Sequence, residues 1–210
     1  MKPLGSSGSG SSTARQSQLP ARRSDGRVRI RPARIEDLDR IAQVEATCFS
    51  VPWNPGVFRS LIGRPGVYLL VAELDWIREE VGGSTVSTKS FRIVGHGILW
   101  RAAEEAELAN LAVDPAFRGQ GVAGALLDRL IDEASGAGVT SVFLEVRASN
   151  EAALVLYVGR GFHQVGVQRH YYDQPREDAR VLQLTLASGG GGGMPEIDDS
   201  DGSQHMRRQR

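Results

Sequence analysis

The chain has 210 residues, 40% of them hydrophobic, and its 25 basic residues are matched by 25 acidic ones. This length and composition suffice for one sizeable core, and the balanced charge gives no reason to expect nucleic acid as a partner. The single cysteine, Cys48, excludes an intramolecular disulfide framework and suits a reducing compartment, so we expect a cytoplasmic protein.

The two ends of the chain differ in composition from the middle. Residues 1–27 are rich in Ser, Gly and Arg and contain no apolar run, so they indicate neither a secretory signal nor a membrane span. An organelle transit peptide is the alternative, although too few apolar residues alternate with the arginines. Residues 188–210 contain a run of five glycines, Gly189 to Gly193, which is typical of a flexible tether. We therefore expect a disordered tail over 1–27, one folded domain over 28–187 and a flexible tail over 188–210.

Hydrophobic periodicity predicts three strands and two helices in the first half of the folded region. The predicted elements are a strand at Val28–Arg31, helices at Ile35–Phe49 and Pro55–Ile62, and strands at Val67–Glu73 and Arg92–Arg101. The connection over Leu74–Phe91 exceeds the length of usual hairpin loops, so we expect an insertion, mobile rather than functional. Cys48 lies on the apolar side of its helix, with Leu38, Ile41 and Phe49, so we expect it in the core rather than as a nucleophile.

A glycine-rich loop connects the next strand to a helix. The apolar run Leu108–Val113 stops at Asp114-Pro115, and a helical pattern begins at Val122, after Arg118-Gly119-Gln120-Gly121. Glycines let the main chain come close to a phosphate, and a helix N-terminus presents unpaired N–H groups to it. The order strand, glycine loop, helix thus favours an anionic cofactor, with a tight turn that binds nothing as the alternative.

Two common phosphate loops do not fit this segment. A Walker loop ends in Lys followed by Ser or Thr, whereas Ala123-Gly124 stands there. Gly119, Gly121 and Gly124 are in a poor register for the dinucleotide fingerprint.

A second strand and helix follow. Val139–Arg147 is rich in β-branched and aromatic residues, and Ser149 or Asn150 is placed to cap a helix that closes at Gly159–Phe162. On these residues alone, Glu145 is a solvated carboxylate or a partner of Arg147, and Tyr157 is helix packing. An acidic residue inside so apolar a strand nonetheless hints at a cleft.

Taken together, these motifs resemble the GNAT superfamily of acetyl-CoA-dependent N-acetyltransferases. The resemblance is carried by Asn110-Leu111-Ala112-Val113, Arg118-x-x-Gly121-x-Ala123, Leu144-Glu145-Val146, Ser149-Asn150 and Leu156-Tyr157-x-x-x-Gly161-Phe162, and it spans about Val28 to Ala187. It implies an α/β fold with a mostly antiparallel mixed sheet, splayed parallel strands and flanking helices. Ala123 replaces the common second glycine of the loop, which is an accepted variant, and the insertion over 74–91 departs from the family pattern.

The resemblance also implies roles for individual residues. Glu145 matches the proton acceptor and Tyr157 the proton donor to the CoA sulfur, while Glu107 is the rival base. The residues implied to bind acetyl-CoA are Leu111, Ala112, Val113, Arg118, Gly119, Gln120, Gly121, Val122, Ala123, Gly124 and Asn150. His96, His163 and His170 are not at metal-ligand spacing, so no metal is expected.

Within the superfamily, the Pro52-Trp53 and Arg169-x-Tyr171-Tyr172 segments look most like the RimI-like branch. Members of that branch acetylate the N-terminal alanine of a small-subunit ribosomal protein, which implies a peptide N-terminus as partner, with no direct nucleic acid and no membrane. Two alternatives stay open at this point: acetylation of a lysine side chain or small amine, and a non-catalytic acyl-CoA-binding module.

Overall fold

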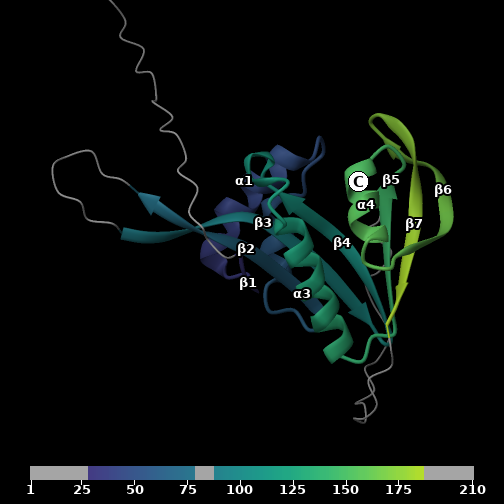
Figure 1. Cartoon of the computed structure of the whole chain (residues 1–210), viewed down its shortest axis with the longest axis horizontal. Helices are drawn as coiled ribbons and strands as arrows, with labels where there is room; N and C mark the ends of the chain where they lie inside the picture. Colours follow the sequence, from purple (N-terminus) through teal and green to yellow (C-terminus); the bar gives the residue numbers. More distant parts are fainter. Residues whose placement is uncertain (1–27, 79–87, 187–210) are drawn as a thin grey trace, which may run out of the picture.

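The computed structural model describes residues 28–78 and 88–186, which form a seven-stranded sheet with helices on both faces (Figure 1). The strands lie in the order β1-β2-β3-β4-β5-β7-β6, and all neighbours are antiparallel except β4 and β5. They are β1 (Arg29–Pro32), β2 (Val67–Arg78), β3 (Thr88–Ala102), β4 (Glu105–Val113), β5 (Ser141–Arg147), β6 (His163–Asp173) and β7 (Arg176–Thr185). The predicted class, a mostly antiparallel mixed sheet flanked by helices, is confirmed.

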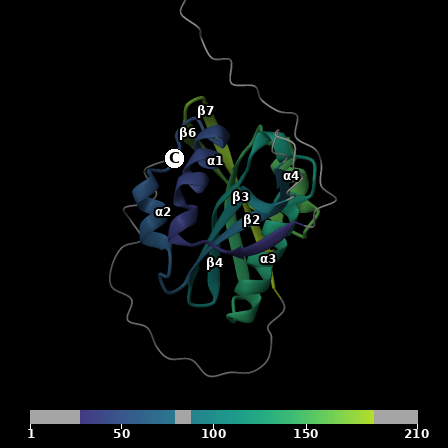
Figure 2. The ribbon, with the colours of Figure 1, turned by 90° about the vertical axis from the view of Figure 1, so that its left-hand side faces the viewer.

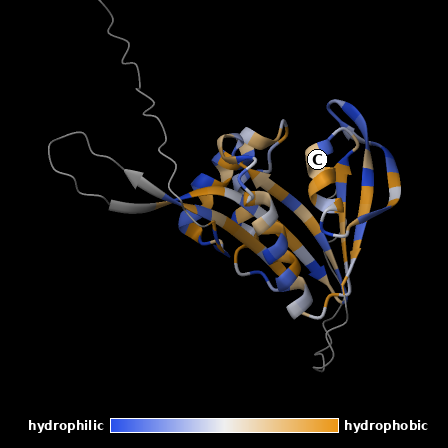
Figure 3. Cartoon of the chain, in the orientation of Figure 1, coloured by the Kyte–Doolittle hydropathy of each residue, from blue (hydrophilic) through white to orange (hydrophobic). Residues whose placement is uncertain are grey.

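Two layers of helices enclose the sheet (Figure 2). The helices are α1 (Leu38–Cys48), α2 (Pro55–Leu61), α3 (Val122–Gly136) and α4 (Glu151–Val158), with short 3-10 turns at Ile35–Asp37 and Pro115–Phe117. Helices α1 and α2 bury Ile41 and Phe58 against one face, and α3 buries Leu126 and Leu130 against the other. Figure 3 shows the apolar residues along α3 and the central strands, while the tip of the β6–β7 hairpin is hydrophilic.

Local sequence signals explain where these helices begin. The side chain of Asn54 accepts a hydrogen bond from the Gly56 N–H at 2.8 Å, and Pro55 occupies the first turn of α2. Asn150 caps α4 in the same way, accepting from the Ala153 N–H at 3.2 Å. Of the two candidate caps, Asn150 therefore fills that position.

Two expectations about element boundaries are corrected. The predicted helix over Ile35–Phe49 is a 3-10 turn followed by α1, which ends at Cys48. The predicted loop over 74–91 is wrong in extent, because β2 and β3 stay paired from Leu74↔Arg92 to Arg78↔Thr88. That this segment is an insertion relative to the family pattern stays a prediction. Main-chain hydrogen bonds stabilise such a hairpin even where the sequence lacks the alternation of apolar and polar residues that predicts a strand. The sequence therefore contains no signal for this part of the pairing. Residues 79–87 and the two predicted tails lie outside the described residues.

The parallel pair β4 and β5 separates partway along its length. Pairing covers Glu105↔Ser141 to Glu107↔Phe143 only, and in Figure 1 the two strands diverge beyond it. The second half of β4 therefore has β3 on one side and no β5 neighbour on the other. This divergence opens the sheet where the predicted site residues are found.

Candidate active site

Strand β4 turns part of its main chain toward the opening. Val94 accepts from the Asp114 N–H at 2.8 Å, so the alternation of an antiparallel ladder gives His96↔Ala112 and Ile98↔Asn110 the hydrogen bonds with β3. The N–H and C=O groups of Leu111 and Val113 consequently face the side that β5 has left. Unpaired strand edges of this kind bind extended ligands through the main chain.

A bulge sets this register. Ile98 pairs with Asn110 and Leu99 with Leu108, so Ala109 is an extra residue in β4. A bulge places two consecutive side chains on nearly the same face of a sheet. Here Ala109 packs into the core under α1 and α2, and Asn110 hydrogen-bonds Glu45 of α1. Without the extra residue, Asn110 would point to the opposite face.

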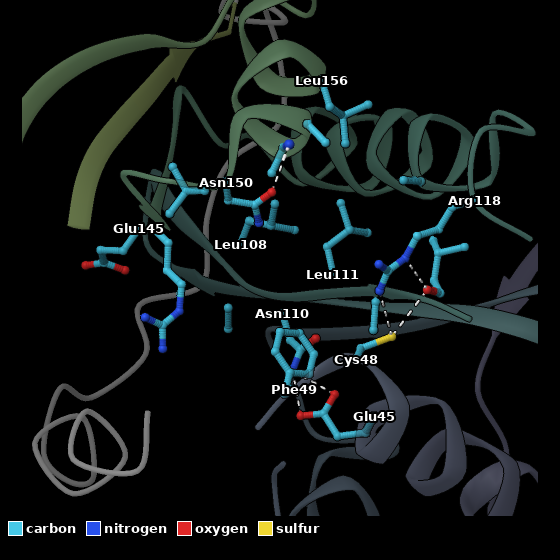
Figure 4. A pocket seen from close by; sticks show the side chains of 18 of the residues that line it. Glu45, Cys48, Phe49, Leu108, Asn110, Leu111, Arg118, Glu145, Asn150 and Leu156 are labelled. Atoms are coloured by element: carbon cyan, nitrogen blue, oxygen red, sulfur yellow. Dashed lines mark hydrogen bonds between the residues drawn. The ribbon is translucent and has the colours of Figure 1, made fainter. Parts of the chain in front are cut away.

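The opening is a cleft of about 1420 Å³, lined by residues from both faces of the sheet (Figure 4). That volume lies above the usual range for a site that binds one small ligand. The predicted site residues that line the cleft are Leu111, Ala112, Val113, Arg118, Gly119, Gly121, Val122, Ala123, Gly124, Glu145, Asn150 and Tyr157. Gln120 is absent from the lining, and its side-chain amide turns back to the Ala116 carbonyl at 3.4 Å.

The glycine loop adopts the conformation that its sequence predicts. Gly119 and Gly121 have φ of 71° and 78°, a region that side chains with a Cβ rarely enter, and Gly121 is the N-cap of α3. The Nε of Arg118 donates to the Val113 carbonyl at 3.2 Å, which ties the loop to the end of β4. The first turn of α3 thus presents its N–H groups at the rim of the cleft, as an anion site requires.

Glu145 lies on β5 two residues beyond the last pair with β4, where its half-buried carboxylate reaches the cleft. Its Oε1 accepts a hydrogen bond from Gln168 Nε2 on β6 at 3.3 Å. Tyr157 comes from the opposite side of the opening, on α4, and is 8% exposed with its ring 5.7 Å from that of Phe162. One carboxylate and one phenol therefore line the same cleft from separate elements, which is the arrangement that acid and base chemistry needs.

Arg147, two residues after Glu145, holds the β6–β7 hairpin over this end of the cleft. Its guanidinium lies 3.9 Å from the Tyr172 ring centroid, 3.3 Å from Glu177 and 3.0 Å from the Gln174 carbonyl. Hydrogen bonds from Ser149 and Arg147 hold the pKa of Glu177 below its usual range, so the carboxylate stays charged beside Arg147. The segment Tyr172 to Pro175 is thereby fixed as part of the cleft wall.

The structure bears on two further residues that the sequence singled out, Glu107 and Cys48. Glu107, the rival base, lies where β4 still pairs with β5 and is not among the described residues that line the cleft. Cys48, expected in the core, is half-buried and lines the cleft instead, with its thiol 3.2 Å from the Val113 carbonyl. Helix α1 ends at this residue, so the apolar stripe of the helix stops short of it.

Among residues 28–78 and 88–186, no cluster of His, Cys, Asp or Glu is arranged to hold a metal. Within those same ranges, no helix is long and apolar enough to cross a membrane.

Sequence reasoning missed a polar cluster beneath the cleft, formed by Glu45, His96 and Asn110. These residues are 1%, 0% and 5% exposed, and Glu45 and Asn110 also line the cleft. A signal was present in the sequence, because Glu45 interrupts the apolar stripe of α1 one turn after Ile41. A charged residue at such a position needs buried partners, and these come from β3 and β4.

Comparison with known proteins agrees with this fold and cleft. Residues 38–162 match the family model described as "Acetyltransferase (GNAT) family". The chain therefore belongs to the GNAT family of N-acetyltransferases, whose members use acetyl-CoA.

Individual relatives indicate which branch of the GNAT family this chain resembles. The [ribosomal protein bS18]-alanine N-acetyltransferase of Haemophilus ducreyi is 34% identical over 154 residues, which is 72% of this chain and 95% of that protein. The crystal structure of the ribosomal-protein-S18-alanine N-acetyltransferase from Escherichia coli has a TM-score of 0.64 and 30% identity, covering 80% of this chain and 99% of that one. Arabidopsis thaliana NAA60, crystallised with acetyl-CoA, shares the fold at a TM-score of 0.62 and 19% identity, covering 76% and 99% of the two chains. The likeness to the RimI-like enzymes is thus confirmed.

The residues present fit the cosubstrate of this family. The pyrophosphate of acetyl-CoA suits the N–H groups at the first turn of α3, where Gly119 and Gly121 leave open space. The edge of β4 at Leu111 and Val113 suits the pantetheine arm. The Val113 carbonyl already accepts hydrogen bonds from Cys48 and Arg118, so at that residue the N–H is the group left to bind the cosubstrate.

Proposed function

We propose that this chain transfers the acetyl group of acetyl-CoA to the α-amine of a protein N-terminus, with an N-terminal alanine as the acceptor. The observation that carries this proposal is the position of Glu145 and Tyr157 in one cleft with the glycine loop. The similarity to enzymes named for the N-terminal alanine of a ribosomal protein supports the acceptor. The partner we propose is accordingly the N-terminus of a small-subunit ribosomal protein.

The chemistry requires two proton transfers, and the cleft offers a group for each. An α-amine has a pKa near 8, so a sizeable fraction is already neutral near neutral pH, and a carboxylate such as Glu145, acting directly or through water, takes the one N–H proton that the neutral amine loses as it attacks. The bound thioester supplies the acetyl group: the C–N bond forms as the C–S bond breaks. Tyr157 then gives its phenolic proton to the departing sulfur and prevents the reverse reaction. Glu145 is the base and Tyr157 the acid.

An assay with acetyl-CoA and three acceptors tests this proposal. We expect acetylation of a peptide that begins with free alanine, and none of a peptide whose N-terminus is blocked but which carries lysine. A lysine amine has a pKa of about 10.4, so it demands a stronger base or a drier site than one half-buried glutamate provides. Preferred acetylation of the blocked lysine peptide or of a small amine would contradict the acceptor. Binding of acetyl-CoA without any turnover would favour the non-catalytic alternative.

A further inference from the structure

The buried cluster beneath the cleft centres on the carboxylate of Glu45. Its Oε1 accepts from the Trp53 backbone N–H at 3.1 Å, and both of its oxygens accept from Asn110 Nδ2 at 3.2 Å. Its Oε2 lies 3.1 Å from His96 Nε2. One side chain of α1 thus joins β3, β4 and the loop that follows α1.

Both ends of that loop are hydrogen-bonded to Glu45. The Phe49 N–H donates to the backbone carbonyl of Glu45 at 3.1 Å, and the Trp53 N–H donates to its side chain. The Trp53 ring is fixed as well, with its centroid 5.9 Å from those of Phe58 and Trp100. The five residues from Phe49 to Trp53, called here the α1–α2 loop, therefore have one defined path.

Stability alone does not account for so polar a cluster. Within the described part of the chain, His96 Nδ1 and Asn110 Oδ1 are buried without a hydrogen-bond partner. A buried polar network that is only partly satisfied is a poor source of stability, because desolvation offsets its hydrogen bonds. The better explanation is that the cluster holds another part of the cleft in a defined position.

The α1–α2 loop is what the cluster positions. All five of its residues line the cleft, and Phe49 and Val51 are 37% and 52% exposed there. The glycine loop, α3 and Tyr157 lie on the other face of the sheet, so the cosubstrate suits that side. Large apolar side chains that are exposed in a cleft mark a binding surface. Because the cosubstrate suits the other face, the acceptor peptide is the substrate that this surface would bind.

We infer that Glu45 is a positioning residue that sets the acceptor side of the cleft by holding the α1–α2 loop against β4. This inference rests on the proposed function for the identity of the acceptor. Glu45 is 1% exposed and acts through the loop that it holds. It controls where Phe49 and Val51 meet the peptide, while the binding of acetyl-CoA depends on the other wall.

Two substitutions at Glu45 separate positioning from proton transfer. Glu45→Leu removes both acceptor oxygens, and we expect the KM for an alanine peptide to rise about tenfold or more, with the Kd for acetyl-CoA within about twofold of the wild type. Glu45→Gln keeps one oxygen for Trp53 and Asn110, and its amide can donate to His96, so we expect a KM close to that of the wild type. The matched control is Glu73→Leu, which removes another buried carboxylate, 6% exposed and bonded to Arg31, outside the cleft lining. It should lower stability without changing the KM.

Three outcomes would overturn the inference. In the first, Glu45→Leu loses stability as Glu73→Leu does but keeps its peptide KM. In the second, acetyl-CoA binding weakens in parallel with peptide binding. In the third, Glu45→Gln is as impaired as Glu45→Leu, which would assign Glu45 to proton transfer.

Hydrogen exchange on the wild type is a second readout that needs neither a variant nor a substrate. The Trp53 amide should exchange slowly, as its bond to Glu45 demands, and fast exchange would overturn the inference even if Glu45→Leu failed to fold. Failure of the wild type to acetylate an alanine peptide would instead count against the proposed function alone.

Discussion

The guanidinium of Arg160, two residues after the end of α4, lies directly over Gly124 in the first turn of α3. A Cβ at position 124 would collide with Nη2 of Arg160, whose Nε is bonded to Asp128 Oδ1 at 2.5 Å. The absence of a side chain at Gly124 thus lets α4 tie itself to α3 beside the glycine loop. Two helices that flank the cleft are held together beside that loop.

This relationship predicts a contrast between two glycines. Gly124→Ala should change the free energy of unfolding by less than about 1 kcal/mol, because the far end of a flexible arginine can move away and alanine favours the helix. Gly95→Ala should cost about 1–3 kcal/mol, because its Cβ would lie 2.8 Å from the Ala112 backbone oxygen, which cannot move. Urea unfolding of the two variants checks this. Equal losses would contradict the stated contacts.

A second prediction tests the glycine loop as the phosphate site. Gly121→Glu should weaken acetyl-CoA binding by about 100-fold or more, because a carboxylate at the N-cap of α3 would repel the phosphates. Gly121→Ala is the control: it carries the same backbone strain at a φ of 78°, while its Cβ meets nothing within 4 Å. Calorimetric titration with acetyl-CoA measures both. If the Glu and Ala variants bind alike, the loop does not hold the phosphates.

The third prediction concerns the pH dependence of stability. Burial raises the pKa of Asp37, but hydrogen bonds from the Arg31 guanidinium and the Arg34 N–H outweigh burial, so the pKa lies below its ordinary value. A carboxyl group with a lowered pKa stabilises the fold above its unfolded-state pKa, near 4, and this contribution is lost as the pH falls through its folded-state pKa. Asp37→Asn should therefore cost about 3 kcal/mol at neutral pH and progressively less below about pH 4. Urea unfolding of both chains across this range measures the difference. A cost that does not change with pH would exclude the ion pair as its source.

The glycine loop and the capped helices could be predicted because their causes are local. Gly121 needs its left-handed φ whatever surrounds it, and Asn150 finds its N–H partner within one turn. The proposed base and acid, Glu145 and Tyr157, came from a motif resemblance, since neither residue type alone distinguishes a catalytic group from a packed or solvated one.

The cluster beneath the cleft could not be predicted in the same way. Glu45 and Asn110 are 65 residues apart, and they meet only because the bulge at Ala109 turns Asn110 toward α1. A bulge depends on the register between two strands, and a local sequence pattern does not determine that register. Likewise, the position of Cys48 on the cleft wall depends on where α1 ends against β4.

The last prediction tests the mechanism. Glu145→Gln keeps the shape of the side chain and a hydrogen-bond acceptor for Gln168 but removes the base, so kcat/KM for an alanine peptide should fall by about 10² to 10⁴. Because the glycine loop and the edge of β4 are unchanged, the Kd for acetyl-CoA should stay within about twofold. Tyr157→Phe should lower kcat/KM in the same range, since it keeps the ring beside Phe162 and removes the proton for the departing sulfur. The control is Gln168→Ala, which deletes the hydrogen bond that Gln168 donates to Glu145 and should affect activity far less than loss of the carboxylate itself. Steady-state kinetics, with calorimetry for cosubstrate binding, measure all three variants. Full activity of both Glu145→Gln and Tyr157→Phe would remove this mechanism, and a tenfold larger effect of Gln168→Ala than of Glu145→Gln would place the essential group on β6 instead.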